Sequence, residues 1–191
     1  MSGLSRAFLV PGLLLALAAC EKETVVPTQR DSLAKMNVDQ VIYGLEHIMT
    51  TGGVRKANLH GDTAYFRDSD SRVDLKGVKL DFFNETTGAT SGSLTSKTGK
   101  YDMRTGAMTA TGNAVLTVQG PSGTRTVTSE ELNYDVAGNR IWSDKPTVMK
   151  ENGREVRGAS FESDAKFQNL TVRNAQGTGP GPSQSGGQVR F

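Results

Sequence analysis

Apolar and polar residues alternate along most of the chain between Gln40 and Arg173. A period of two is typical of strands that bury one face, and hardly any segment shows the longer period of a helix. The first run predicts one shared face for Val41, Tyr43, Leu45, His47 and Met49. The pattern therefore predicts an all-β, antiparallel fold built mostly from hairpins.

Two later runs predict which side chains point inward. In residues 72–83 the inward set is Val73, Leu75, Val78, Leu80 and Phe82, with a change of phase in the middle. Gly77 lies at that change, and a glycine at a phase shift predicts a β-bulge. In residues 112–120 the inward set is Ala114, Leu116 and Val118.

Turn-forming residues separate these runs at intervals of about ten residues. They lie at 51–53, 67–70, 104–106, 121–123, 137–139 and 151–153. A weak repeat is also present, because Tyr101-Asp102 recurs as Tyr134-Asp135, and Met108 is matched by Ile141 at the same spacing. Each unit reads as strand, Tyr-Asp, tight turn, strand, and we expect the aspartates to accept hydrogen bonds from turn N–H groups.

The N-terminus holds the only cysteine of the chain, Cys20. A positive charge at Arg6, an apolar run of about eleven residues and a few small residues precede it. The run is too short for a membrane-spanning helix, which needs roughly 20 residues. The order of these features resembles a bacterial lipobox, in which the cysteine is acylated and the chain is cut just before it. A plain secretory cleavage is the alternative.

The organisation that follows has four parts. We expect a lipoprotein signal peptide at 1–19, a lipidated tether at 20–37, a β-domain at 38–173 and a flexible Gly/Pro/Ser-rich tail at 174–191. The formal charge of the chain is +2, which implies no strong attraction to nucleic acid.

The order of five segments resembles the LptC family, a group of OstA-like lipopolysaccharide-export proteins. The segments are GVRKANLHGDTAYF, VDLKGVKLDFF, LTSKTGKYDMRTGAMTATGNAVLTV, LNYDVAGNRIWSDKPTVMKENG and GASFESDAKFQNLTVRN. The resemblance implies an open antiparallel β-jellyroll whose interior holds lipid acyl chains. LptC proteins commonly carry an N-terminal transmembrane helix, and this chain has a lipobox-like segment in its place.

The same resemblance implies partners and a location. The ligand is expected to be lipopolysaccharide, through its lipid A. The expected protein partners are an inner-membrane ABC transporter and a periplasmic LptA-like jellyroll that binds by edge-strand pairing. The expected location is the periplasm, with the chain anchored through Cys20 to the inner membrane in preference to the outer one.

The candidate groove residues are the inward apolar side chains, for which plain core packing is the alternative. They are Leu75, Val78, Leu80, Phe82, Met108, Leu116, Val118, Leu132, Ile141, Phe161 and Phe167. Four basic residues are candidates for contacts with lipid A phosphates, or are solvated surface charges: Arg55, Lys56, Lys76 and Lys79.

Catalytic and metal-binding patterns are weak. His47 is expected at a groove mouth or in a satisfied core position, and His60 in a solvated, turn-like stretch. Two histidines and one acylated cysteine give no metal-ligand spacing, no nucleophile elbow occurs, and no cofactor is expected. The sequence therefore favours a non-enzymatic lipid carrier. A closed β-protein that assists envelope assembly, binding a protein and no lipid, is the alternative.

Overall fold

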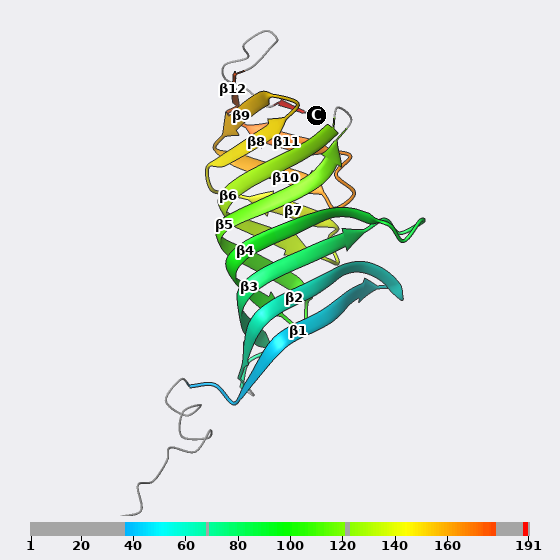
Figure 1. The fold of residues 1–191 in the computed structure, drawn as a ribbon, viewed down its shortest axis with the longest axis vertical. Helices are drawn as coiled ribbons and strands as arrows, with labels where there is room; N and C mark the ends of the chain where they lie inside the picture. The colour runs from blue at the N-terminus through cyan, green and yellow to red at the C-terminus, as the bar shows by residue number, and fades with distance from the viewer. Residues whose placement is uncertain (1–36, 68, 121–122, 179–188, 191) are drawn as a thin grey trace, which may run out of the picture.

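The computed structural model describes residues 37–67, 69–120, 123–178 and 189–190. The expected signal peptide, Cys20 and nearly all of the tether lie outside these residues. The described part is one 13-stranded sheet in which every pairing is antiparallel. The all-β, antiparallel fold expected from the alternation is therefore confirmed (Figure 1).

The strands fall into six long ones and seven short ones. The long strands are β1 (Gln40–Thr51), β2 (Val54–Phe66), β3 (Arg72–Phe83), β4 (Thr90–Asp102), β5 (Ala107–Gly120) and β6 (Gly123–Asp135). The short strands are β7 (Arg140–Ser143), β8 (Thr147–Glu151), β9 (Arg154–Gly158), β10 (Ser160–Asp164), β11 (Leu170–Arg173), β12 (Gln176–Thr178) and β13 (Val189–Arg190).

The sheet branches at β6. Strands β1 to β6 pair in sequence order, and the later half of β6 then pairs with β7, followed by β10, β11 and β13. The earlier half of β6 pairs with β8, followed by β9 and β12. Pro146 lies between β7 and β8, where the chain passes from one half of β6 to the other.

The long strands change phase at one level, which we call the crease. The crease runs through Gly44, Asp62, Gly77 and Lys97, the positions that oppose one another when the register pairs on either side are followed. It continues at Gly112 on β5, where the register with β4 and with β6 shifts by one residue. The three glycines in this row have positive φ angles of 65°, 61° and 79°. Glycine adopts this conformation at little cost, so β1, β3 and β5 can bend here.

The crease divides the sheet into two facing walls, and Figure 1 shows the strands curving round between them. The first wall contains residues 45–51, 54–61, 78–83, 90–96, 114–120 and 123–129 with β8, β9 and β12. The second wall contains residues 40–43, 63–66, 72–76, 98–102, 107–111 and 131–135 with β7, β10, β11 and β13. The apolar faces of the two walls meet in a single buried core.

Two sequence-based expectations about phase were wrong. Gly77 is not a β-bulge, because the register of β3 with β2 and β4 is unbroken there. The neighbouring strands β2 and β4 change phase at the same level, so no extra residue is left unpaired on β3. Tyr43 does not share the inward face, since it is 75% exposed while Ile42 packs against the core. The positive φ of Gly44 reverses the phase, and Leu45 then resumes the inward side.

The repeat is confirmed by the pairing. Tyr101 opposes Met108 in the β4–β5 hairpin, as Tyr134 opposes Ile141 in the β6–β7 hairpin. Asp102 accepts hydrogen bonds from the N–H groups of Arg104 and Thr105 at 2.9 and 3.0 Å, the turn role expected for it.

The sheet continues past Arg173, where the sequence predicts the end of the β-domain. Strand β12 pairs with β9, and β13 pairs with β11. Residues 179–188 lie outside the described part of the chain.

Substitution of Gly77 by alanine should destabilise the crease more than the same change elsewhere. A Cβ at Gly77 would overlap the carboxylate of Asp62 and lie 2.9 Å from the Asp62 Cβ, in addition to the positive φ of 61°. We expect a loss of about 2–3 kcal/mol in the free energy of unfolding, measured by urea denaturation.

Gly88→Ala is the matched control for this change. Gly88 also has a positive φ, 69°, but a Cβ added there would meet no atom within 4 Å. Only the backbone cost of about 1 kcal/mol should remain at this position. Equal losses in the two variants would mean that the contact between Asp62 and the crease does not constrain the bend.

Candidate lipid-binding site

The eleven predicted groove residues all lie in the core between the two walls. Their side chains are between 0% and 8% exposed, with Leu80, Leu116, Leu132 and Ile141 at 0% and Phe167 at 8%. The structure therefore brings them together as one apolar surface, with residues of the first wall facing residues of the second. Their inward orientation, which alternation predicts, is confirmed; contact with a lipid remains a prediction.

The two walls touch through specific side chains. The Phe82 ring, on the first wall, meets the Tyr134 ring of the second wall edge-on, with centroids 5.1 Å apart. Phe82 also meets Phe167, in the loop between β10 and β11, with centroids 5.4 Å apart. The aromatic cluster of Phe82, Tyr134 and Phe167 thus joins the walls near their free rims.

A second contact joins the walls nearer to β1. The Nε2 atom of His47, on the first wall, lies 2.9 Å from the Tyr101 hydroxyl on the second wall. Because β1 and β4 are not neighbours in the sheet, this hydrogen bond crosses the interior. His47 is half-buried and hydrogen-bonded, which fits the satisfied core position expected for it.

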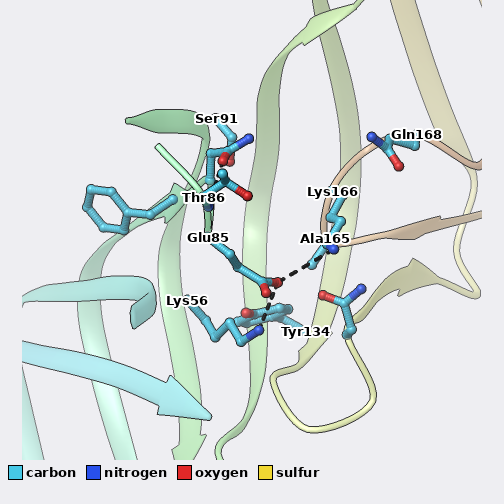
Figure 2. A pocket seen from close by; sticks show the side chains of 11 residues that line it. Lys56, Glu85, Thr86, Ser91, Tyr134, Ala165, Lys166 and Gln168 are labelled. Carbon is cyan, nitrogen blue, oxygen red and sulfur yellow. Dashed lines mark hydrogen bonds and ion pairs between the residues drawn. The ribbon is translucent and has the colours of Figure 1, made fainter. Parts of the chain in front are cut away.

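A polar pocket of about 190 Å³ lies between the rims of the walls, above the aromatic cluster. The β3–β4 loop and Lys56 line it on one side, and Tyr134, Asn139 and the β10–β11 loop line it on the other. Figure 2 shows Glu85 reaching into the pocket between two lysines. Its carboxylate lies 2.8 Å from Lys56 Nζ and 3.9 Å from Lys166 Nζ. We call Lys56, Glu85 and Lys166 the rim triad.

These contacts determine the charge of the rim triad. The hydrogen bond from Lys56 is the main cause that holds the pKa of Glu85 below its ordinary value, and Lys166 adds to it. The triad therefore carries two positive charges and one negative charge near neutral pH. It ties the rims of both walls together over the interior.

Tyr134 lies beneath the triad and is 2% exposed. Burial raises the pKa of its phenol strongly, and the negative charges of Asp135 and Glu85 raise it further. Its hydroxyl therefore stays protonated far into the alkaline range.

Stability should fall at alkaline pH because of this tyrosine. Above about pH 10 an unfolded tyrosine ionises while the buried Tyr134 holds its proton, so rising pH favours the unfolded chain. Between about pH 8 and about pH 11, the wild-type protein should lose more free energy of unfolding than Tyr134→Phe does. Parallel pH profiles of the two proteins in urea denaturation would contradict this.

The four predicted headgroup residues do not form one cluster. Of them, Lys56 alone lines the pocket, while the Arg55 guanidinium stacks at 3.7 Å from the centroid of the Phe83 ring. Lys76 lies over the Tyr65 ring at 5.3 Å, and Lys79 pairs with Asp81 at 2.8 Å. Sequence reasoning missed Glu85 and Lys166, because they lie in loops of opposite walls with no pattern linking them.

The other polar candidates support no catalytic centre. His60 is not in a turn as expected but in the middle of β2, where its ring contacts Asn58 at 3.1 Å. Glycine and aspartate follow it at the crease, which explains the turn-like sequence. Within the described residues, no group of three or more His, Cys, Asp or Glu side chains is placed to hold a metal ion.

The ends of the sheet offer open edges. Within the described residues β1 pairs with β2 alone, and Tyr43 and Ile48 on β1 are 75% and 58% exposed. At the other end, each branch ends in a short strand, β12 or β13. Trp142 lies half-buried on the outer face of β7 beneath the Arg140 guanidinium, 4.6 Å away. No helix in the described residues is long and apolar enough to cross a membrane.

Comparison with known families gives a match over residues 7–178 to the family described as "LptC: Lipopolysaccharide-assembly, LptC-related". The chain belongs to the LptC-related family. The family resemblance of the five sequence segments is thereby confirmed. Membership assigns the chain a role in lipopolysaccharide transport, and this family is not an enzyme family.

The comparison of this LptC-related chain with solved structures gives a weaker likeness than the family match. One similar solved structure is LptH from Pseudomonas aeruginosa, described as "the LptA homologous periplasmic component of the conserved lipopolysaccharide transport device". It is 18% identical, with a TM-score of 0.48, and the match covers 71% of this chain and 93% of LptH. No curated protein sequence matches the chain significantly.

Proposed function

We propose that this LptC-related protein carries lipopolysaccharide by holding the acyl chains of lipid A between its two walls. The observation that carries the proposal is the continuous apolar surface of both walls, which spans the sheet from Met49 on β1 to Val172 on β11. Each methylene moved from water to such a surface is stabilised by roughly 0.8 kcal/mol. Sugars and phosphates remain at the polar rims.

Entry of a lipid requires the walls to separate, because their side chains already fill the space between them. The links that must open are the Phe82 cluster, the Glu85–Lys166 pair of the rim triad and the His47–Tyr101 hydrogen bond. On the side opposite the rims, at the crease, the two walls stay connected through their strands. Opening exposes apolar surface, which the acyl chains then cover.

The open edges support transfer between proteins. The unpaired backbone groups of β1 at one end, and of β12 and β13 at the other, offer templates for strand addition. We propose that one end receives lipopolysaccharide from an inner-membrane ABC transporter and the other passes it to an LptA-like jellyroll. A lipidated Cys20 holds the chain at the periplasmic face of the inner membrane, since two or more acyl chains suffice for stable anchoring.

The proposal is tested by measuring the distance between the rims. Spin labels are placed at Thr87 and Met103, which are exposed at the rims of opposite walls and do not line the pocket, in a Cys20→Ser background that leaves no other cysteine. Purified lipopolysaccharide should lengthen the distance between these labels. The distance between a control pair at Thr51 and Thr87, both on the first wall, should not change.

The assembly function is the second candidate, and the close packing of the walls favours it. If lipopolysaccharide leaves the rim-to-rim distance unchanged and does not bind, the interior is a permanent core. The chain then contributes to the envelope through its edges alone.

A further inference from the structure

We propose that the pocket at the rims is a phosphate-binding subsite, in which a phosphate on the lipid's sugar replaces the Glu85 carboxylate between Lys56 and Lys166. This inference rests on the proposed function and names the part of the glycolipid that the rims recognise. The ligand chemistry is a phosphate monoester attached to a sugar.

The charges of the pocket fit this ligand. Lys56 is held with its side chain only 17% exposed, while Lys166 is 56% exposed and can move toward a ligand. Glu85 is shared between the two lysines, at 2.8 Å and 3.9 Å. A phosphate carries more negative charge and more acceptor oxygens than one carboxylate, so it can satisfy both lysines at once.

The polar groups around the triad fit a sugar. Thr86 and Ser91 on the first wall, and Asn139 and Gln168 on the second, line the same pocket. Hydroxyl and amide side chains both donate and accept hydrogen bonds, as sugar hydroxyls require. The pocket volume of about 190 Å³ admits a small polar group and leaves the rest of the headgroup outside.

The floor of the pocket leads to the apolar interior. Tyr134 lines the pocket and also contacts Phe82, whose ring belongs to the core. An amphipathic ligand is therefore matched along its length, with phosphate at the triad and acyl chains beneath the aromatic cluster.

Replacement of Glu85 also changes the ion pair that joins the rims. Lys56 and Glu85 belong to the first wall, and Lys166 belongs to the second. A phosphate that takes the place of Glu85 between the two lysines replaces this protein–protein link by one that runs through the bound lipid. The headgroup then holds the two rims while the acyl chains lie beneath them.

Binding of the purified protein to lipid A and to dephosphorylated lipid A in detergent tests the subsite. Lys56→Met and Lys166→Met should each weaken binding of phosphorylated lipid A by about tenfold and leave dephosphorylated lipid A unchanged. Glu85→Gln should strengthen phosphorylated lipid A binding by about fivefold, because a competing negative charge is removed. Lys100→Met is the control, since Lys100 is exposed on β4 outside the pocket.

Each of the other outcomes would overturn a stated part of the proposal. Equal losses for both lipids, or weaker binding in Glu85→Gln, would overturn the subsite and leave the triad as a structural tie. Failure of the wild-type protein to bind either lipid would overturn the lipid-carrier function itself. Inorganic phosphate that binds as tightly as lipid A would show a site for free phosphate, and would overturn headgroup recognition.

Discussion

Phe82→Ala should lower the free energy of unfolding by about 4 kcal/mol, one of the two largest effects that we expect. Phe82 is 1% exposed and is the side chain that touches both Tyr134 and Phe167 across the interior. Its removal takes away the transfer free energy of a large ring and leaves a cavity between the walls. Urea denaturation monitored by circular dichroism gives the change.

Phe83→Ala is the matched control for this substitution. Phe83 is the next residue along β3, but it is half-buried at the rim and packs under the Arg55 guanidinium. We expect a loss of about 1 kcal/mol there. Similar losses at the two positions would mean that the walls are not joined through Phe82.

The second large effect is expected at a buried ion pair. Glu151→Gln should lower the free energy of unfolding by about 3 kcal/mol, because it leaves the Arg125 guanidinium without its carboxylate in a buried position. The Arg125 side chain is 3% exposed, and its Nε and Nη2 atoms lie 3.1 and 2.8 Å from Glu151 Oε2. The pair joins β6 to β8, where the branch of β8, β9 and β12 begins.

Glu155→Gln is the control that separates the effect of burying an ion pair from the effect of losing a negative charge. Glu155 pairs with Lys150 and Arg157 on the surface of β9, so its loss should change stability little. A Glu151→Gln variant as stable as Glu155→Gln would show that the guanidinium finds other partners or solvent, and that the pair does not hold the branch in place.

The sequence predicts the individual strands better than their arrangement. Alternation identifies Val78, Leu80 and Phe82 as inward residues, because each strand's own polarity pattern sets its buried face. The phase change at Gly77 is visible too, but one strand alone cannot distinguish a bulge from a crease. That distinction depends on whether the neighbouring strands change phase at the same level.

Only the apolar part of the candidate site could be predicted from the sequence. Lys56 appeared as a basic residue beside a strand, but its partners Glu85 and Lys166 are brought to it by the folding of one wall over the other. No local pattern encodes such a contact between distant loops. Tyr43 was misplaced for a related reason, since the positive φ of Gly44 reverses the phase within an otherwise regular alternation.

The most direct test of lipid carriage is photocrosslinking of lipopolysaccharide in intact cells, with the probe amino acid placed in turn at Leu80, Phe82, Leu116 and Leu132. These four side chains are at most 1% exposed and face the space between the walls. Lys79 and Asp81, their neighbours on the outer face, serve as controls. We expect lipopolysaccharide adducts at the inward positions and none at the controls. A folded, well-expressed protein that gives no inward adduct would contradict lipid carriage between the walls.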